Sequence, residues 1–238
     1  SEDFAGGYIF TGNPDLKRTV IDNFDLRFER YGEAGEIMAV SMFSKIFDNP
    51  IERVILNVYN EISFQNVDQA RVHGIEFEVR KNLGSFAGRL SNFRSGFNVS
   101  FVTSEVDIPE REMLVKLVSD PDADDTREFQ GQSPYIVNFD LNYENDDRGI
   151  KSTLYYNTFG RRLSESSIGA TPYVYEEPRH TLNYSLTKSI TERISLKFSG
   201  KNLLDSDHKR TQSFKGKEYV VTKYSSGRSF SLGLSYKM

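Results

Sequence analysis

The stretch Gly227-Arg228-Ser229-Phe230-Ser231-Leu232-Gly233-Leu234-Ser235-Tyr236-Lys237-Met238 decides the fold that this sequence predicts. Side chains of an extended strand alternate between its two faces. One face therefore carries Phe230, Leu232, Leu234, Tyr236 and Met238, and the other carries small or charged residues. An apolar face of about ten residues is what a tilted strand needs to cross the hydrocarbon core of a bilayer. We therefore predict a membrane strand whose second face lines a watery or plugged lumen.

The same alternation recurs in eight segments upstream, at residues 23–29, 38–43, 75–80, 97–101, 135–144, 153–157, 182–187 and 194–199. The segments are joined alternately by short links (32–35, 82–92, 145–149, 189–193) and by long polar links (48–70, 105–133, 160–179, 205–226). Outer-membrane barrels show this regular difference between short periplasmic turns and longer extracellular loops. We therefore predict an all-β, antiparallel transmembrane β-barrel rather than a soluble sandwich or solenoid.

Composition agrees with this prediction. Aromatic residues reach 13%, although the mean hydropathy is −0.52, as expected when only one face of each strand contacts lipid. There is no cysteine, so neither disulfides nor thiolate chemistry are available. The net charge of −4 argues against nucleic acid as a partner. We expect no signal peptide in residues 1–238, because the acidic start is not followed by an apolar segment.

The predicted strands assign two environments to their side chains. We expect a lipid-facing set of Phe139, Leu141, Phe198, Phe230, Leu232, Leu234, Tyr236 and Met238. We expect a lumen-facing set of Asp25, Arg27, Glu76, Glu78, Arg80, Asp140, Lys197 and Lys201. Both signs of charge occur in the second set, so the lumen is not a simple anion or cation funnel.

Nine or ten strands do not make a complete barrel of this kind. A closed single-chain bacterial barrel has an even number of strands, and unpaired strand edges in lipid cost several kcal/mol per backbone group. We therefore expect residues 1–238 to be the C-terminal portion of a larger barrel.

Seven short motifs, in the same order along the chain, carry a resemblance to the C-terminal barrel half of TonB-dependent outer-membrane receptors. They lie at 12–17 (GNPDLK), 73–78 (HGIEFE), 130–138 (QGQSPYIVN), 156–162 (YNTFGRR), 175–180 (YEEPRH), 201–205 (KNLLD) and 227–233 (GRSFSLG). The resemblance implies a 22-stranded barrel around an N-terminal plug in the outer membrane of a Gram-negative bacterium. Neither the plug nor a TonB box is expected within residues 1–238.

The resemblance also implies a function and partners. The function is active uptake of a scarce or bulky ligand, such as a siderophore, vitamin, oligosaccharide or peptide, without enzymatic activity or a cofactor. The implied partners are the TonB energy-coupling complex, reached through the missing N-terminal part, and the barrel-assembly machinery. That machinery usually recognises a terminal Phe, whereas this sequence offers Tyr236 and Met238. Membrane lipid, lipopolysaccharide, a surface lipoprotein and other outer-membrane subunits are further partners to consider.

A few residues outside the strands are candidates for chemistry. Asp120, Asp122, Asp124 and Asp125 have the oxygen ligands that calcium prefers, but they equally suit a solvated acidic loop. The segment Asp205-Ser206-Asp207-His208 could form an Asp–His pair that activates water, although a charged loop is the simpler interpretation. His73 and His180 are expected at the barrel rim rather than on a metal.

The long loops contain two apolar features. The run 113–118 is expected to extend a strand above the membrane, with a ligand-contacting or lid patch as the alternative. The second feature is a set of four tyrosines in or beside the loops: Tyr173, Tyr175, Tyr219 and Tyr224. We expect them either to stack on a ligand or to anchor the protein at the membrane interface.

Three other classes of protein remain as alternatives to a transport receptor. A barrel subunit or scaffold without transport would begin naturally near Ser1, whereas a receptor would carry a plug upstream. A barrel hydrolase would need His208, and a soluble binding sandwich would stay in solution without detergent.

Overall fold

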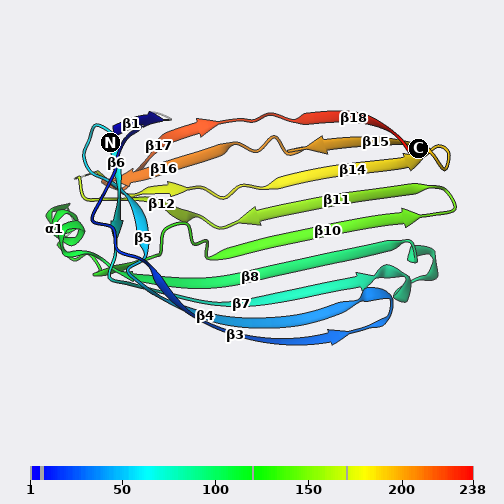
Figure 1. Cartoon of the computed structure of the whole chain (residues 1–238), viewed down its shortest axis with the longest axis horizontal. Helices are drawn as coiled ribbons and strands as arrows, with labels where there is room; N and C mark the ends of the chain where they lie inside the picture. The colour runs from blue at the N-terminus through cyan, green and yellow to red at the C-terminus, as the bar shows by residue number, and fades with distance from the viewer. Residues whose placement is uncertain (1, 6–7, 120, 170, 238) are drawn as a thin grey trace.

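The computed structural model describes residues 2–5, 8–119, 121–169 and 171–237. Nine long strands of this described part form one continuous antiparallel sheet (Figure 1). In spatial order they are β3 (Val20–Tyr31), β4 (Ile37–Asp48), β7 (Gln69–Asn82), β8 (Phe93–Asp107), β10 (Tyr135–Asn145), β11 (Ile150–Phe159), β14 (Thr181–Ser189), β15 (Ile194–Lys201) and β18 (Ser229–Tyr236). Each covers all or most of one of the nine alternating segments, so the predicted antiparallel all-β fold is confirmed.

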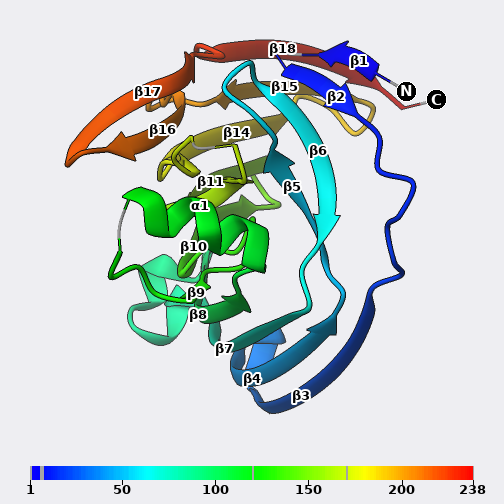
Figure 2. The same cartoon turned by 90° about the vertical axis from the view of Figure 1, so that its left-hand side faces the viewer.

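The sheet is strongly curved. Figure 2 looks along the strands, and the row from β3 to β18 follows an arc like part of a barrel wall. Strands β3 and β18 are the two edges of this row. Curvature of this kind follows from the twist between neighbouring strands and from the tilt that barrels require.

The two ends of the sheet differ as the link lengths predict. At one end, on the right of Figure 1, neighbouring strands are joined by short connections. Two of them contain short 3-10 turns: η1 (Glu33–Gly35), and η2 (Leu83–Ser85) with η3 (Gly88–Leu90). At the opposite end, the long connections form a second body of structure.

The long connections, together with two short strands that precede β3, pair to make an eight-stranded sheet. Its order is β1 (Glu2–Ala5), β2 (Tyr8–Thr11), β6 (Glu61–Asn66), β5 (Ile51–Ile55), β12 (Arg162–Ser167), β13 (Val174–Glu176), β16 (His208–Phe214) and β17 (Lys217–Tyr224). β2 pairs with β6, and β5 with β12, in parallel between segments far apart in sequence. We call this sheet, with the short strand β9 (Thr126–Arg127) and the helix α1 (Glu110–Ser119), the loop body.

The prediction that residues 113–118 extend a strand is wrong, because they lie in α1. Pro109 precedes the helix, and Glu110 and Glu112 occupy its first turn, where negative charge is favourable. The helix buries Glu112 and leaves Leu114 and Val118 exposed. A short apolar run cannot distinguish a strand from a helix by its period alone. No helix in the described ranges is long and apolar enough to cross a membrane.

The two packed clusters of buried apolar residues lie in or next to the loop body. Ile55, Ile62 and Val174 form one cluster with Phe10 packed against it. A second cluster combines Val67, Ala70 and Val106 with Phe47 and Phe129.

Pairing register places most of the large apolar side chains of the wall on one face. Phe139 pairs with Phe97 on one side and with Tyr156 on the other, and Phe198 pairs with Leu186 and Leu232. Many residues of this face are exposed, among them Phe28 at 62% and Leu232 at 77%. A continuous apolar surface of this extent is unfavourable in water and indicates an apolar environment.

The two faces give a direct test of the environment of the wall. We expect Phe198→Arg to lower the free energy of unfolding by about 2–4 kcal/mol, because an arginine would enter the hydrocarbon. Ser199→Arg changes the neighbouring residue on the other face and should have a small effect. Urea titration of the full-length protein, folded into lipid vesicles, measures both. Equal losses for the two variants would contradict the assigned faces.

Candidate functional site

The face of the wall opposite the apolar one is polar across many strands. Arg27 pairs with Ser41, and Ser41 pairs with Glu76 on the next strand. In a second row, Glu78 pairs with Asn98, and Asn98 pairs with Asn138. All eight residues predicted to face the lumen lie on this side of the sheet: Asp25, Arg27, Glu76, Glu78, Arg80, Asp140, Lys197 and Lys201. We call this the polar face.

Charged groups on the polar face form ion pairs near β3 and β7. Arg27 Nη2 donates to Glu78 Oε2 at 2.8 Å, and Arg80 Nη2 lies 2.9 Å from the other oxygen of Glu78. Ser100 Oγ donates to Glu76 Oε1 at 3.2 Å. The side chains of Arg27 and Arg80 remain 38% and 63% exposed, so this network is open to water or to another part of the protein.

Farther along the polar face, neutral groups replace ion pairs. Asn138 Oδ1 accepts hydrogen bonds from Tyr155 Oη and Asn157 Nδ2, both at 2.8 Å. Thr153 Oγ1 donates to Asn142 Oδ1 at 2.8 Å. The polar face is therefore a hydrogen-bonding surface of mixed charge, suited to contact water, a polar domain or a polar ligand.

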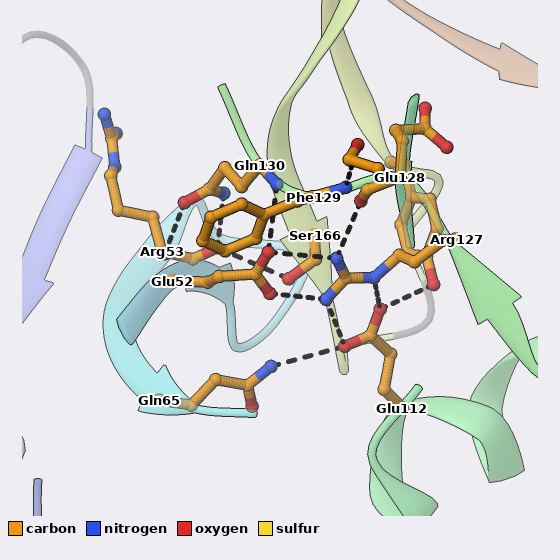
Figure 3. Close-up of polar contacts among 11 residues, drawn as sticks. Glu52, Arg53, Gln65, Glu112, Arg127, Glu128, Phe129, Gln130 and Ser166 are labelled. Carbon is orange, nitrogen blue, oxygen red and sulfur yellow. Dashed lines mark hydrogen bonds and ion pairs between the residues drawn. The ribbon is translucent and has the colours of Figure 1, made fainter. Parts of the chain in front are cut away.

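Arg127 is the central residue of the loop body and was not anticipated from the sequence (Figure 3). Its guanidinium is 2% exposed and contacts Glu52 on β5 and Glu112 on α1. Arg127 Nη2 donates to Glu52 Oε2 at 2.6 Å, and Arg127 Nε donates to Glu112 Oε1 at 2.8 Å. The arginine thus connects β9, β5 and α1.

Two carboxylates share one guanidinium, so the cluster carries a net negative charge that other donors offset. Tyr173 Oη donates to Glu112 Oε1 at 2.5 Å, and Gln65 Nε2 donates to Glu112 Oε2 at 3.3 Å. The Gln130 backbone N–H donates to Glu52 Oε1 at 3.0 Å. Burial alone would lower the pKa of Arg127, but its hydrogen bonds to the two glutamates outweigh burial and raise the pKa.

A third buried carboxylate lies in the same eight-stranded sheet as Glu52. Glu165 on β12 is fully buried, with Arg53 Nη2 and Arg210 Nη1 at 3.3 Å and 3.0 Å from its Oε1. Arg53 and Arg210 come from β5 and β16. The two clusters join the long connections through pairs that are costly to break singly, because removing one partner leaves a buried charge.

The loop tyrosines fall into two groups. Tyr219 and Tyr224 are exposed, whereas Tyr173 and Tyr175 are half-buried. The Tyr175 ring lies 4.0 Å from the Arg161 guanidinium carbon. Burial raises the pKa of both Tyr173 and Tyr175 above the ordinary value, and the nearby charges of Glu112 and Glu128 add to this.

Asp207 and His208, from the segment predicted to form an Asp–His pair, each contact a different residue. Asp207 Oδ2 lies 2.8 Å from Lys223 Nζ, and the His208 ring stacks on Tyr224 with centroids 4.5 Å apart. Burial and the charge of Arg179 lower the pKa of His208. His180 Nδ1 is 2.7 Å from Tyr156 Oη, while His73 lies in β7.

Among the described residues, the acidic loop does not gather the several ligands that a metal site needs. Asp120 lies outside the described residues, and Asp122, Asp124 and Asp125 are exposed. No group of three or more His, Asp or Glu side chains able to hold a metal ion occurs in the described ranges. The calcium hypothesis stays a prediction. Met238 also lies outside the described residues, so its predicted contacts are open.

The curved sheet with one apolar and one polar face defines a membrane β-barrel wall, and comparison with known proteins identifies its family. A family model described as "TonB dependent receptor-like, beta-barrel" matches residues 1–203. This is most of the chain, which therefore belongs to the TonB-dependent receptor β-barrel family. No curated protein matches the sequence significantly.

Three solved structures illustrate the shared fold. A mutant of the ferric enterobactin receptor PfeA from Pseudomonas aeruginosa, in complex with enterobactin, is 15% identical, with a TM-score of 0.59 over 96% of this chain and 33% of the receptor. The copper transporter OprC is 14% identical, with a TM-score of 0.62 over 100% and 36%. The ferric yersiniabactin uptake receptor FyuA from Yersinia pestis is 16% identical, with a TM-score of 0.61 over 92% and 30%.

The chain thus spans about a third of the length of the receptors that it matches. Barrels of this family lie in the outer membrane of Gram-negative bacteria. The predicted family and outer-membrane location are confirmed. At these identities the likeness to individual receptors shows the fold and not the ligand.

The buried arginine gives a test of how the loop body is held together. We expect Arg127→Met to destabilise the loop body by about 3–5 kcal/mol, since two buried carboxylates would lose their cation. Lys209→Met removes an exposed cation paired with Glu218 at 3.0 Å and should cost little. Hydrogen exchange of the full-length protein, read separately for the loop body and the wall, measures the effect. Unchanged protection in Arg127→Met would show that the cluster does not stabilise the loops.

The raised pKa values of Tyr173 and Tyr175 predict alkaline weakening of the same region. An unfolded tyrosine ionises at a pH of about 10, below the folded value here, so stability is full below pH 10 and declines above it. We expect proteolysis of the loop body to accelerate above that pH, and less steeply in Tyr173→Phe. A proteolysis rate that does not change between about pH 9 and 11 would contradict this prediction, because the linkage relation requires stability to fall in that range. An equally steep rise in Tyr173→Phe would contradict the contribution of Tyr173.

Proposed function

We propose that residues 1–238 form the C-terminal wall and outer loops of a receptor that takes up a scarce or bulky ligand by TonB-dependent active transport. The match of the family model to residues 1–203 carries this proposal. The two-faced wall and the folded loop body support it. Candidate ligands are siderophores, vitamins, oligosaccharides and peptides. The matching structures include a ferric enterobactin receptor, a ferric yersiniabactin uptake receptor and a copper transporter.

In this proposal the apolar face contacts membrane lipid. Seven of the residues assigned to it share that face by register: Phe139, Leu141, Phe198, Phe230, Leu232, Leu234 and Tyr236. The polar face lines the lumen, where its open ion pairs and amides would contact a plug domain and water. The eight-stranded loop body would face the cell exterior and lipopolysaccharide.

The remaining partners are part of the proposal. The TonB complex would act through a segment beyond the chain described, and the barrel-assembly machinery would recognise the last strand near Tyr236 and Met238. A surface lipoprotein or another outer-membrane subunit would contact the loop body.

Uptake by cells tests the proposed function. We expect deletion of the full-length gene to abolish energy-dependent uptake of at least one compound from a panel of radiolabelled ferric siderophores, copper, cobalamin, maltodextrins and peptides. The uptake should return with the intact gene and should vanish when TonB is deleted or the proton gradient is collapsed. Uptake of every compound that is equal with and without the gene, or restored uptake that does not need TonB, would contradict the proposal.

A further inference from the structure

The charged residues on the apolar face of the wall are separated by sign along the strands. Alternation and register place on this face Asp22, Arg30, Asp48, Arg71, Lys81, Glu105, Asp107 and Lys188. At the end with the short connections, on the right of Figure 1, all of them are basic. They are Arg30, Lys81 and Lys188, each the second-last residue of its strand, and we call them the basic edge. The acidic residues of the face all lie toward the long connections.

Aromatic rings lie at the same level of the apolar face as the basic edge. Phe93 is the first residue of β8 and pairs with Tyr143 on β10, and their ring centroids are 4.9 Å apart. Tyr236, the last residue of β18, is exposed. Tyrosine rings are enriched where the hydrocarbon of a bilayer meets its headgroups. The basic edge is therefore at the level of the headgroups when the apolar face is in lipid.

The side chains of the basic edge can take further partners. Arg30 is exposed and has no ion pair with any residue in the described ranges. Lys81 Nζ lies 2.6 Å from Glu36 Oε2, but its side chain is still 36% exposed. Lys188 Nζ donates to the Arg148 carbonyl. An ammonium group has three N–H donors, so both lysines keep donors for a second acceptor.

The positive charge belongs to the face of the wall and not to the connections beyond it. Those short connections carry both signs, at Glu33, Arg89, Asp146, Asp147, Arg148, Glu192 and Arg193. On the face itself, Glu36 is the acidic neighbour of the basic edge, and it is held by Lys81 and by the backbone N–H of Asn82 at 3.2 Å. An anion that approaches the edge from the lipid therefore meets more cations than carboxylates.

We propose that the basic edge binds the anionic headgroups of phospholipids, such as phosphatidylglycerol, in the periplasmic leaflet. Short connections of outer-membrane barrels are periplasmic, which places the edge in that leaflet. Long basic side chains lay their stems along apolar surface and extend the charged group to the interface. There they would donate charge-assisted hydrogen bonds to the phosphate. This inference rests on the membrane placement in the proposed function and not on uptake.

Two fluorescent labels on one strand test the proposal. Ser95 pairs with Lys81, and Thr103 lies on the same face of β8 toward the long connections. Ser95→Cys or Thr103→Cys in the full-length receptor is labelled with bimane, in phosphatidylcholine vesicles whose two leaflets have the same composition. Nitroxide-labelled phosphatidylglycerol or nitroxide-labelled phosphatidylcholine is then added as the quencher. We expect the first to quench the Ser95 label about fivefold more effectively, and the Thr103 label without this preference.

Variants and salt identify the charges responsible. Arg30→Gln combined with Lys81→Gln should bring the quenching ratio at Ser95 close to one. Arg71→Gln removes the same charge from the other end of the same face and should leave the ratio unchanged. Salt at about 0.5 M should reduce the ratio in the receptor without these charge changes, because ions screen exposed charges. This last measurement does not depend on the folding of a charge variant.

Three results would overturn the proposal. They are equal quenching of the Ser95 label by the two lipids, a ratio that the double variant does not change, and an equal loss of the ratio in Arg71→Gln. If neither lipid quenches either label, the apolar face is outside the lipid, and the membrane placement fails together with this inference. A lipid preference that stands while uptake fails would refute transport alone.

Discussion

The whole structure depends on one constraint on the strands of the wall. Each strand must pair its backbone N–H and C=O groups with neighbouring strands, while its two faces meet opposite environments. In hydrocarbon an unpaired N–H or C=O costs several kcal/mol, so a spanning sheet must be continuously paired. The wall meets this condition from β3 to β18 through an antiparallel ladder. Because side chains alternate along each paired strand, the apolar residues then share one face and the polar residues share the other.

The loop body is stabilised in a different way. It buries small apolar clusters together with Arg127, Glu52, Glu112 and Glu165. Buried ion pairs contribute little net stability relative to apolar packing, but they strongly penalise arrangements in which a partner is missing. We infer that these buried charges favour one arrangement of the long connections over the many others that the connections could adopt. Glu112 also links α1 and Tyr173 to the same cluster.

The wall was predictable because its signal is local. Phe139, Asp140 and Leu141 reveal their faces from a window of a few residues, and the short turns at 145–149 and 189–193 set the order of neighbours. The loop body was not predictable in this way. The pairing of Val54 with Ser166 joins residues that no periodicity relates, and residues 113–118 have a pattern that fits a strand or a helix equally. Arg127 lies in a two-residue strand with no motif around it.

The sequence by itself determined the all-β class, the nine wall strands, the face of each of their side chains and the family, since alternation and short turns act between near neighbours. Only the tertiary structure decided the partners of the long connections, the helix at 110–119 and the burial of Arg127 between two glutamates. Those features depend on contacts between segments 15 to 113 residues apart, such as Arg127 with Glu112 and Ser166 with Arg53. Such contacts form only when the wall has brought the ends of its strands together.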